Sequence, residues 1–471
     1  MGSSSALPFV SVAVLNYNGL RFLDGCLGSL ARLDYPSDRY AVVLVDNVSK
    51  DGSVEVAEKR FPDVRVVRND RNLGFAGGNN VAMRSASADY VVLLNNDTSV
   101  DPRWLSRLVE AAEQDPFAGA CTSKLLFQHD RARVTLVATP FRPSERGSSD
   151  QRELGVRLLS ARCLQDGESR DAEYLEGIYG WEPSPSSIFR WSGPSATLGL
   201  RVRNDGGPAS LCLVASAPRP NGDSVTMVVR FGEMVLGCWE LSAEPRKIDI
   251  LLPAELVRSA TPVIQNAGTL ILRDGSGRDR GALVRGTEVF QEDDKGQYDR
   301  REEVFAGCGA ALLLRKAMLE DVGIFDDDFF MYYEDMDLSW RMRRRGWKVV
   351  YVPDAVVCHV HAASSVEWSP LFLFHVERNR LLMLSKNAPL GLAVSEHARY
   401  FASVALNLGR YGRSLLFRAP DRSAAGARAR IQLRVAASLL RLLPSTLAKR
   451  RALARREVVP STKLLNWMVA G

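Results

Sequence analysis

The first part of the chain alternates between buried apolar runs and amphipathic stretches. Apolar runs occupy residues 9–15, 40–45, 64–67 and 90–94, and helical patterns lie at 21–33, 53–60 and 79–86. Apolar runs of this length are typical of strands that are buried on both faces of a sheet. Their alternation with helices predicts βαβα order, and therefore a mostly parallel sheet in an α/β fold.

The pattern changes after about residue 127. Strong helical periodicity fades, and short β-like runs appear at residues 195–202, 210–215, 224–231, 248–252 and 269–272. Turn residues rich in Gly, Pro, Asn and Asp separate these runs, as at 204–208 and 218–223. Short strands at such spacing predict an all-β sandwich, which we expect to be inserted into the α/β domain.

The α/β pattern resumes near residue 304, and a basic helical pattern follows from about residue 381 to the end. A chain of 471 residues is long enough for several domains, and we expect four parts. These are the first half of the α/β domain at 9–128, the inserted β-sandwich at 129–290, the second half at 291–385 and a basic helical C-terminal region at 386–471.

The composition is that of a soluble globular protein, with 46% apolar and 25% charged residues and a formal net charge of +6. The seven cysteines are scattered and form no CxxC pair. This spacing argues against a disulfide framework or a zinc ribbon and favours reduced thiols in the cytoplasm. No apolar run is long enough to span a bilayer, and the first residues lack the pattern of a signal peptide. We therefore expect a cytoplasmic protein.

Three acids, Glu334, Asp335 and Asp337, follow directly after the aromatic and apolar run at 329–333. Like charges this close raise one another's pKa, so packing alone does not favour the arrangement. A helix N-terminus, whose dipole stabilises acids, is the ordinary explanation. The functional alternative is a general base, because a carboxylate held against an apolar wall suits that role.

Polar side chains follow the second and fourth predicted strands. Asp46 ends the second strand, at the sheet edge where ligands bind in open α/β folds, and it can accept hydrogen bonds from a nucleoside. A turn or N-cap role is the alternative for Asp46. Asn95 and Asp97 follow the fourth strand, and their hard oxygen atoms suit a divalent cation. The glycine-rich stretch at 72–80 either lets the backbone approach a ligand or forms a plain turn before a helix.

Further short motifs accompany these residues along the chain. Together the motifs occupy residues 14–19, 45–47, 51–53, 72–80, 94–98, 305–310, 322–326, 333–335, 346–347, 359 and 378–380. With these motifs in this order, the chain resembles the family 2 glycosyltransferases, which have the GT-A fold. Within that family it is similar to the bacterial rhamnosyltransferase-like and galactofuranosyltransferase-like enzymes. The resemblance covers about residues 9–128 and 300–385, so the β-rich insert and the basic tail lie outside it.

The resemblance implies a role for each matching position. Asp335 would be the catalytic base, with Glu334 beside it shaping the acceptor site. Asp97 would be the surviving acid of a DxD metal motif whose first acid is replaced by Asn95, which leaves the strength of metal dependence open. His359 would complete the shell of Mn²⁺ or Mg²⁺, and a purely structural histidine is the alternative. The residues that would bind the nucleotide sugar are Asn16, Tyr17, Asn18, Asp46, Asn72, Gly74, Asn79, Asn96 and Arg378.

These roles imply an inverting glycosyltransferase that moves rhamnose or galactofuranose from a nucleotide-diphosphate donor to a glycan or lipid-linked glycan. A base takes the proton of the acceptor hydroxyl, while a cation or arginines such as Arg378 and Arg380 stabilise the leaving diphosphate. For these arginines a solvated helix face is the alternative. We expect the activity to serve bacterial cell-envelope polysaccharide synthesis. A non-catalytic glycan-binding or scaffold protein that keeps the fold is the competing hypothesis.

The tail is strongly basic. Between Arg399 and Lys463 the sequence has fifteen Lys and Arg residues, against the two acids Asp421 and Glu457, and leucines are interleaved with them. Basic amphipathic helices bind anionic membrane surfaces. Nucleic acid is the competing partner for such charge, and packing on the catalytic domain is the plainest alternative. We expect peripheral contact with the inner face of the plasma membrane and no nucleic-acid partner.

The predicted insert is rich in large aromatic side chains, namely Tyr174, Tyr179, Trp181, Trp191 and Trp239. Exposed aromatic rings stack on sugar faces, whereas large aromatic residues of β-sandwiches are usually core residues. We expect most of them to belong to the core. We also expect the insert to help bind a glycan or to form the contacts of a homo-oligomer.

Overall fold

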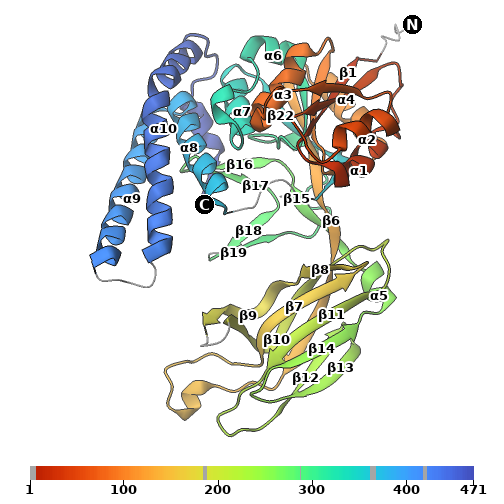
Figure 1. Cartoon of the computed structure of the whole chain (residues 1–471), viewed down its shortest axis with the longest axis vertical. Coiled ribbons are helices and arrows are strands. Elements are labelled where there is room, and N and C mark those ends of the chain that lie inside the picture. Colours follow the sequence, from red (N-terminus) through yellow and green to blue (C-terminus); the bar gives the residue numbers. More distant parts are fainter. Residues whose placement is uncertain (1–6, 184–187, 287, 361–367, 417–421, 471) are drawn as a thin grey trace. The chain divides into compact units, whose positions relative to one another are not determined.

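A computed structural model describes the whole chain except residues 1–6, 184–187, 287, 361–367, 417–421 and 471. The chain folds into two compact units (Figure 1). The first, here called the α/β unit, comprises Met1–Leu126, Gln265–Ala282 and Gln297–Gly471. The second, the β unit, comprises Phe127–Ile264 and Leu283–Gly296. The predicted α/β fold class, with a β-rich insertion and a helical C-terminal region, is confirmed.

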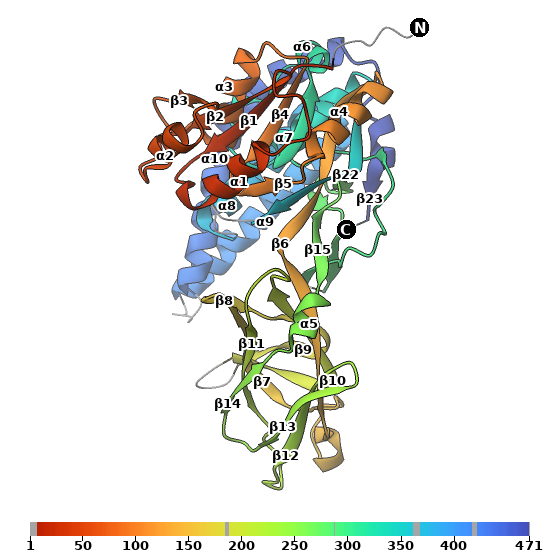
Figure 2. The same ribbon diagram turned by 90° about the vertical axis from the view of Figure 1, so that its right-hand side faces the viewer.

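Four parallel strands form the centre of the α/β unit. β1 (Val10–Asn16) lies between β2 (Tyr40–Asp46) and β4 (Tyr90–Asn95), and β3 (Arg65–Arg68) pairs with the other side of β2 (Figure 2). The apolar runs of the sequence therefore form the sheet. Most side chains of β1, β2 and β4 are buried, as the continuous apolar runs predict.

The direction of the sheet changes beyond β4. β21 (Ala311–Arg315) pairs antiparallel with β4, and β6 (Ala118–Ala138) pairs antiparallel with β21. β6 is one long strand, so the change of pattern at about residue 127 falls inside it. The other strands of this unit are β5 (Thr98–Val100), β16 (Thr269–Leu272), β17 (Gly277–Asp279), β20 (Glu302–Glu303), β22 (Lys348–His359) and β23 (Met468–Val469).

Helices pack on the sheet and form the C-terminal region of the α/β unit. They are α1 (Leu20–Leu30), α2 (Ser53–Arg60), α3 (Gly74–Ser85), α4 (Trp104–Gln114), α6 (Lys316–Val322), α7 (Glu334–Arg344), α8 (Pro370–Asn387), α9 (Leu390–Leu416) and α10 (Arg422–Arg455). Leu23 and Leu27 of α1 and Trp104 of α4 are fully buried in one core with the strand residues. Burial of these apolar faces, rather than helix propensity alone, holds the helices on the sheet.

Helix α3 begins several residues earlier than its periodicity predicts. The glycine-rich stretch that reads as a loop forms the first turn of the helix, which starts at Gly74 rather than at Asn79. A methyl group at Gly78 would come within 2.4 Å of Leu15 of β1. The glycines are therefore needed because α3 lies very close to the strand beneath it.

The β unit is built almost entirely of antiparallel strands with their own core. They include the end of β6, β7 (Arg157–Gln165), β8 (Glu168–Asp171), β9 (Glu173–Pro183), β10 (Ile188–Val202), β11 (Ala209–Ser216), β12 (Val225–Phe231), β13 (Met234–Leu241), β14 (Arg246–Leu251), β15 (Thr261–Asn266), β18 (Ala282–Arg285) and β19 (Glu288–Gln291). The only α-helix among its described residues is the short α5 (Ala254–Arg258). Leu198, Leu213 and Met227 are fully buried in its core.

The three C-terminal helices pack against one another. α9 and α10 run side by side in opposite directions, and α8 contacts both of them (Figure 1). Asp421, which lies between α9 and α10, is outside the described residues. No helix in the described part of the chain combines the length and the apolar character that crossing a membrane requires.

Candidate functional site

The ends of three parallel strands bring a group of polar side chains together. In the sheet Asn16 pairs with Asp46, and Leu15 pairs with Asn95, so the carboxyl ends of β1, β2 and β4 meet at one edge. Asn16 donates from Nδ2 to Asp46 Oδ1 at 2.9 Å, and Asn96 donates from Nδ2 to Asn16 Oδ1 at 2.8 Å. The predicted residues of this edge therefore form one hydrogen-bonded network.

Asp46 and Asn18 order the loops at this edge. Asp46 is almost fully buried, and its carboxylate accepts hydrogen bonds from the backbone N–H and the hydroxyl of Ser49 at 2.9 and 2.5 Å. Asn18 accepts a hydrogen bond from the Lys50 N–H at 2.8 Å and adopts a left-handed φ of 50°. These contacts connect the loop after β1 to the loop after β2. Asp46 thus orders the turn that follows its strand, as the alternative explanation for this residue predicts.

A cavity of about 360 Å³ opens beside this network. Its walls are formed by Leu15, Tyr17, Asn47, Asn72, Gly74, Phe75, Asn95, Asn96, Asp97, Phe330, Met331 and Leu371. Six of these residues are predicted site residues, namely Tyr17, Asn72, Gly74, Asn95, Asn96 and Asp97. The other predicted residues lie outside the described cavity wall; they are Asn16, Asn18, Asp46, Asn79, Glu334, Asp335, His359 and Arg378.

The three predicted metal ligands lie together at one end of the strand edge. His359, at the end of β22, has Nε2 3.0 Å from Asp97 Oδ1 and 3.4 Å from the amide nitrogen of Asn95. Its other ring nitrogen, Nδ1, lies 2.9 Å from Gln265 Oε1. Within the described ranges no three His, Cys, Asp or Glu side chains form a metal-binding group. Asn95, Asp97 and His359 offer one amide, one carboxylate and one imidazole. If the nitrogen and oxygen of the Asn95 amide are exchanged, its oxygen faces His359.

Glu334 and Asp335 form the first turn of α7. Asp335 accepts hydrogen bonds from the N–H groups of Gly309 at 3.0 Å and of Met336 at 2.7 Å. Burial raises the pKa of Asp335 even though these N–H groups act in the opposite direction. A methyl group at Gly309 would lie 3.1 Å from the Phe75 ring and 3.5 Å from Asp335 Oδ2. A side chain at position 309 would therefore meet both the Phe75 ring of the cavity wall and the Asp335 carboxylate.

Glu334 is buried more completely than its neighbour. Its Oε2 atom has no hydrogen-bond partner among the described residues. Burial, together with the nearby charge of Asp335, raises the pKa of Glu334 well above its ordinary value. Burial and this neighbouring charge thus favour the neutral form of Glu334 more than in an ordinary glutamate, and the neutral acid can donate a hydrogen bond.

The segment at 326–333, which leads into these acids, has a strained backbone. Phe330, Tyr332 and Tyr333 have φ values of 61°, 67° and 69°, in the left-handed region that side chains other than glycine rarely adopt. Gly74 accommodates the segment, because a methyl group there would lie 2.5 Å from the Phe330 carbonyl oxygen. That same oxygen accepts a hydrogen bond from the Ala76 N–H at 3.0 Å.

Two neighbouring residues of α8 bind the backbone carbonyls of the segment at 326–333. Asn379 Nδ2 lies 2.8 Å from each of the carbonyl oxygens of Phe329, Met331 and Tyr332. The Arg378 guanidinium donates to the carbonyls of Asp328 at 2.7 Å and Phe329 at 3.1 Å and is largely buried. Arg378, which is predicted to face the diphosphate, is thus placed by the structure against the backbone of this segment.

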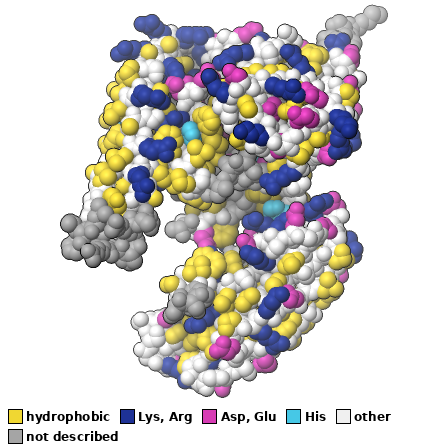
Figure 3. All heavy atoms as spheres, viewed as in Figure 1, with side chains coloured by type: hydrophobic (Ala, Val, Ile, Leu, Met, Phe, Trp, Pro, Cys, Tyr) yellow, Lys and Arg dark blue, Asp and Glu magenta, His cyan; other side chains and the backbone are white. Residues whose placement is uncertain are grey.

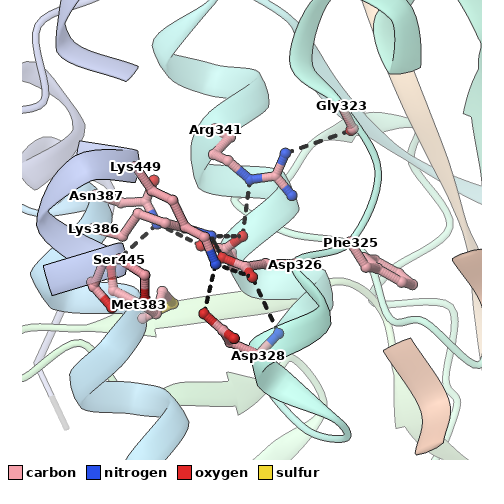
Figure 4. Close-up of polar contacts among 12 residues, drawn as sticks. Gly323, Phe325, Asp326, Asp328, Arg341, Met383, Lys386, Asn387, Ser445 and Lys449 are labelled. Carbon is pink, nitrogen blue, oxygen red and sulfur yellow. Dashed lines mark hydrogen bonds and ion pairs between the residues drawn. The ribbon is translucent and has the colours of Figure 1, made fainter. Parts of the chain in front are cut away.

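A cluster of ion pairs fixes the start of the same segment (Figure 4). Asp326 accepts from Lys386 of α8 at 2.7 Å and from Lys449 of α10 at 2.6 Å, and Lys449 also reaches Asp328 at 2.6 Å. Burial alone would raise the pKa of Asp326, but the two lysines outweigh it and hold that pKa well below the ordinary value. Lys386 also pairs with Asp337 at 2.7 Å, so α8 is connected to α7 as well.

Comparison with known proteins identifies the family. Residues 11–160 match the model of glycosyl transferase family 2, and residues 289–380 match that of glycosyltransferase-like family 2. The chain belongs to glycosyltransferase family 2.

Individual relatives of this family 2 glycosyltransferase match over short stretches. The glycosyltransferase AglE of Haloferax volcanii is 31% identical over 107 residues, 22% of this chain and 35% of the relative. The N-acetylglucosaminyl-diphospho-decaprenol L-rhamnosyltransferase of Mycobacterium tuberculosis is 47% identical over 62 residues, 13% of this chain and 20% of the relative. The chain thus spans about a third or less of the length of these relatives. A crystal structure of GalNAc-T7 with UDP, GalNAc and Mn²⁺ aligns with a TM-score of 0.43 and 12% identity, over 81% of this chain and 48% of that one.

Several residues at the site of this family 2 glycosyltransferase were not singled out from the sequence. Asn47 and Phe75 lie inside the recognised motifs, so their position in those motifs could have marked them. Phe330 and Met331 belong to the apolar run before the acids. Leu371 of α8 carries no such signal, because only the packing of α8 brings it to the cavity.

Proposed function

We propose that the chain is an inverting glycosyltransferase that moves a sugar from a nucleotide-diphosphate donor to a glycan or lipid-linked glycan. One observation carries the proposal. A single cavity has the polar strand ends, with Asp97 and its neighbour His359, on one side and the segment that leads to Asp335 on the other. A donor needs polar groups around its diphosphate, and the acceptor needs a base nearby.

Asp335 is proposed as the general base. Its carboxylate takes the proton of an acceptor hydroxyl while that oxygen attacks the anomeric carbon of the donor sugar. The bond from that carbon to the diphosphate oxygen breaks in the same displacement, and the electron pair leaves with the nucleoside diphosphate. One displacement on the face opposite the leaving group inverts the anomeric centre. The two N–H groups that bind Asp335 fix its orientation, and its raised pKa makes the carboxylate a stronger base than an ordinary aspartate.

Asn95, Asp97 and His359 are proposed to hold Mn²⁺ or Mg²⁺. His359 Nδ1 lies 2.9 Å from Gln265 Oε1, and Nε2 lies 3.0 Å from Asp97 Oδ1. In the tautomer with its proton on Nδ1, His359 would donate to Gln265, and Nε2 would face Asp97 Oδ1 as a second acceptor. Two acceptors that converge in this way suit a cation between them. A bound divalent ion would neutralise the charge that develops on the leaving diphosphate.

We propose rhamnose or galactofuranose as the transferred sugar, in the synthesis of a bacterial cell-envelope polysaccharide. The relative from Mycobacterium tuberculosis, an L-rhamnosyltransferase by name, supports this choice of sugar class. Tyr17, Asn72 and Asn96 line the cavity and are proposed to contact the donor. Asn16, Asn18, Asp46 and Asn79 are proposed to support those contacts from the surrounding loops and from α3. We also propose peripheral contact with the inner face of the plasma membrane through the basic helices.

The β unit is proposed to contribute to acceptor binding. Trp191 is buried, whereas Trp181 is about half exposed and packs edge-on against Tyr174. Tyr174 and Arg190 line a groove of about 370 Å³ within this unit. Aromatic rings beside planar charged groups suit a sugar surface. Trp181→Ala is expected to raise the KM for the glycan acceptor a few-fold and to leave nucleotide affinity unchanged, with Ile188→Ala in the same unit as the control.

The decisive experiment measures release of nucleoside diphosphate from a panel of nucleotide sugars, with and without Mn²⁺ or Mg²⁺ and with lipid-linked glycan acceptors present. Asp335→Asn is expected to lower turnover by about 100- to 10,000-fold and to retain nucleotide binding. Asp24→Asn removes an exposed carboxylate of the same unit and serves as the control. Substantial turnover by Asp335→Asn would disprove the assignment of the base. Neither release nor nucleotide binding with any donor would favour the scaffold hypothesis instead.

A further inference from the structure

The outer face of α9 carries a stripe of exposed apolar side chains. Leu390, Val394 and Phe401 follow one another at spacings of four and seven residues, so they lie on one side of the helix. Their side chains are 67%, 59% and 40% exposed. Single exposed leucines are ordinary on protein surfaces, but an aligned row of large apolar side chains usually indicates a binding surface.

Helix α10 carries a second stripe that meets the first. Its exposed members are Leu433, Leu440, Leu443 and Leu447. Leu440 and Leu443 line one shallow groove together with Phe401 of α9. The two stripes therefore form one continuous surface, here called the apolar seam: Leu390, Val394, Phe401, Leu433, Leu440, Leu443 and Leu447.

Arginines accompany the apolar seam on α10, and further exposed arginines lie elsewhere on α9. On α9 Arg410 and Arg413 are exposed, and on α10 Arg430, Arg434 and Arg441 are exposed. Hydrophobic and basic side chains together cover the part of the surface where α9 and α10 lie (Figure 3). The helical spacing on α10 places these arginines on the exposed face next to its leucines, with Arg434 over the Phe374 ring of α8. On α9 the spacing places Arg410 and Arg413 on a different side of the helix from its apolar stripe.

Acidic residues are almost absent from these helices. The sequences of α9 and α10 contain a single acid, Glu396. Glu396 is buried, and its carboxylate accepts hydrogen bonds from Arg380 at 3.1 Å and from Arg399 at 2.6 Å. The exposed surface of these helices therefore combines apolar and positively charged side chains without acids to balance them.

We propose that the apolar seam docks on the surface of an anionic lipid membrane. Leucine, valine and phenylalanine side chains enter the boundary between head groups and acyl chains, while long arginine side chains reach the lipid phosphates. A second copy of the chain would bring two arginine-rich surfaces together, which like charge opposes. Nucleic acid would match the charge but would leave the leucines in water. The proposal specifies the surface for the membrane contact proposed above, and it does not depend on catalysis.

The test is flotation of the full chain with vesicles of phosphatidylcholine, with and without phosphatidylglycerol. We expect binding only to the vesicles that contain the anionic lipid. Replacing Arg430, Arg434 and Arg441 by Gln is expected to weaken binding by roughly 100-fold, since each basic residue contributes about 1 kcal/mol near such a surface. The control replaces Arg103, Arg162 and Arg203, which are exposed elsewhere, and should bind like the wild type.

A second variant tests the apolar part of the seam. Leu390→Ser with Leu440→Ser is expected to lower vesicle binding by about tenfold, because both side chains lose buried methylene groups. Leu251→Ser is the matched control, since Leu251 is 74% exposed in the β unit. Nucleotide binding in the same samples confirms that each variant is folded.

Three results would overturn the proposal. Equal binding to vesicles with and without the anionic lipid would remove the role of charge. Unchanged binding by both seam variants would place the membrane contact elsewhere. A dimer in light scattering that the leucine variant converts to a monomer, without vesicle binding by the wild type, would make the seam a self-association surface. Loss of turnover with intact vesicle binding would count against the glycosyltransferase function alone.

Discussion

The two sides of the cavity are held in place by different means. On the strand-edge side, Asn16, Asn18 and Asp46 bond to one another or to residues of adjoining loops, and two residues of these loops, Asn18 and Val48, have left-handed φ values. On the side of Asp335, the segment at 326–333 has three residues with left-handed φ values, each of which costs about 1–3 kcal/mol. That segment is restrained by α8 and α10, which lie far along the chain.

This difference indicates that separate sets of contacts control nucleotide binding and turnover. The strand-edge side depends on short motifs whose members lie close together in the sequence. The geometry of the Asp335 side depends on Asn379, Arg378 and Lys449, none of which lines the cavity or bonds to Glu334 or Asp335. Substitutions on the two sides should therefore separate nucleotide binding from turnover.

The largest effect is expected for Asn379→Ala. The substitution removes the amide that lies 2.8 Å from three carbonyl oxygens, so the strained segment loses its main restraint. A displacement of the base by about 1 Å is enough to lower kcat by roughly 100-fold. Nucleotide affinity, measured by calorimetry, should stay within about threefold, because the strand-edge side is untouched.

Asn407→Ala is the control for this prediction, since Asn407 bonds to Gln432 between α9 and α10. It should leave both quantities unchanged. If Asn379→Ala lowered nucleotide affinity as much as kcat, the two sides of the cavity would not be independent, and the comparison would be wrong.

The sequence predicted the strand-edge side better than the other side, for a physical reason. Asp97, Asn96 and Gly74 belong to turns that directly follow strands or begin helices, so local sequence determines their position. The position of Arg378 depends on which buried carbonyls α8 meets, and composition carries no record of that packing. The start of α3 differs from the predicted one for a similar reason, because the glycines there allow the close approach of α3 to β1 and of Gly74 to Phe330.

A pair of glycine substitutions tests whether the two sides meet at Gly74. Gly74 and Gly52 have similar left-handed φ values of 70° and 81°, but only at Gly74 would a methyl group meet another atom, the Phe330 oxygen at 2.5 Å. Both alanine variants lose about 1 kcal/mol to backbone strain. Gly74→Ala should lose a further 1–3 kcal/mol, roughly, from overpacking, as measured by urea unfolding. Equal losses would show that the segment moves aside freely.

Glu334→Gln tests the electrostatics of the acid pair through pH. Burial and Asp335 raise the pKa of Glu334 in the folded state, so its contribution to stability is complete below its ordinary pKa of about 4.3 and is lost as pH rises through the folded-state pKa. Glutamine stays neutral at every pH and avoids that loss. The variant should therefore gain stability relative to the wild type as pH rises, when Tm is measured across a pH series. A constant difference in Tm would mean that the pKa of Glu334 is the same in the folded and the unfolded chain.

The smallest effect is expected for Lys449→Met, which removes one of the two cations on Asp326 and keeps the aliphatic stem. Lys449 is partly exposed, so its ion pairs contribute below about 1 kcal/mol, and Lys386 remains in place. Because the lysines hold the pKa of Asp326 below its ordinary value, this stability is complete above about pH 3.9 and disappears as pH falls through the folded-state pKa. The wild type and the variant should thus differ in urea midpoint at neutral pH and converge in acid. Lys247→Met, which removes an exposed ion pair of the β unit, should change neither stability nor kcat. A loss of turnover in Lys449→Met as large as that of Asn379→Ala would mean that α10, rather than α8, provides the main restraint on the Asp335 side.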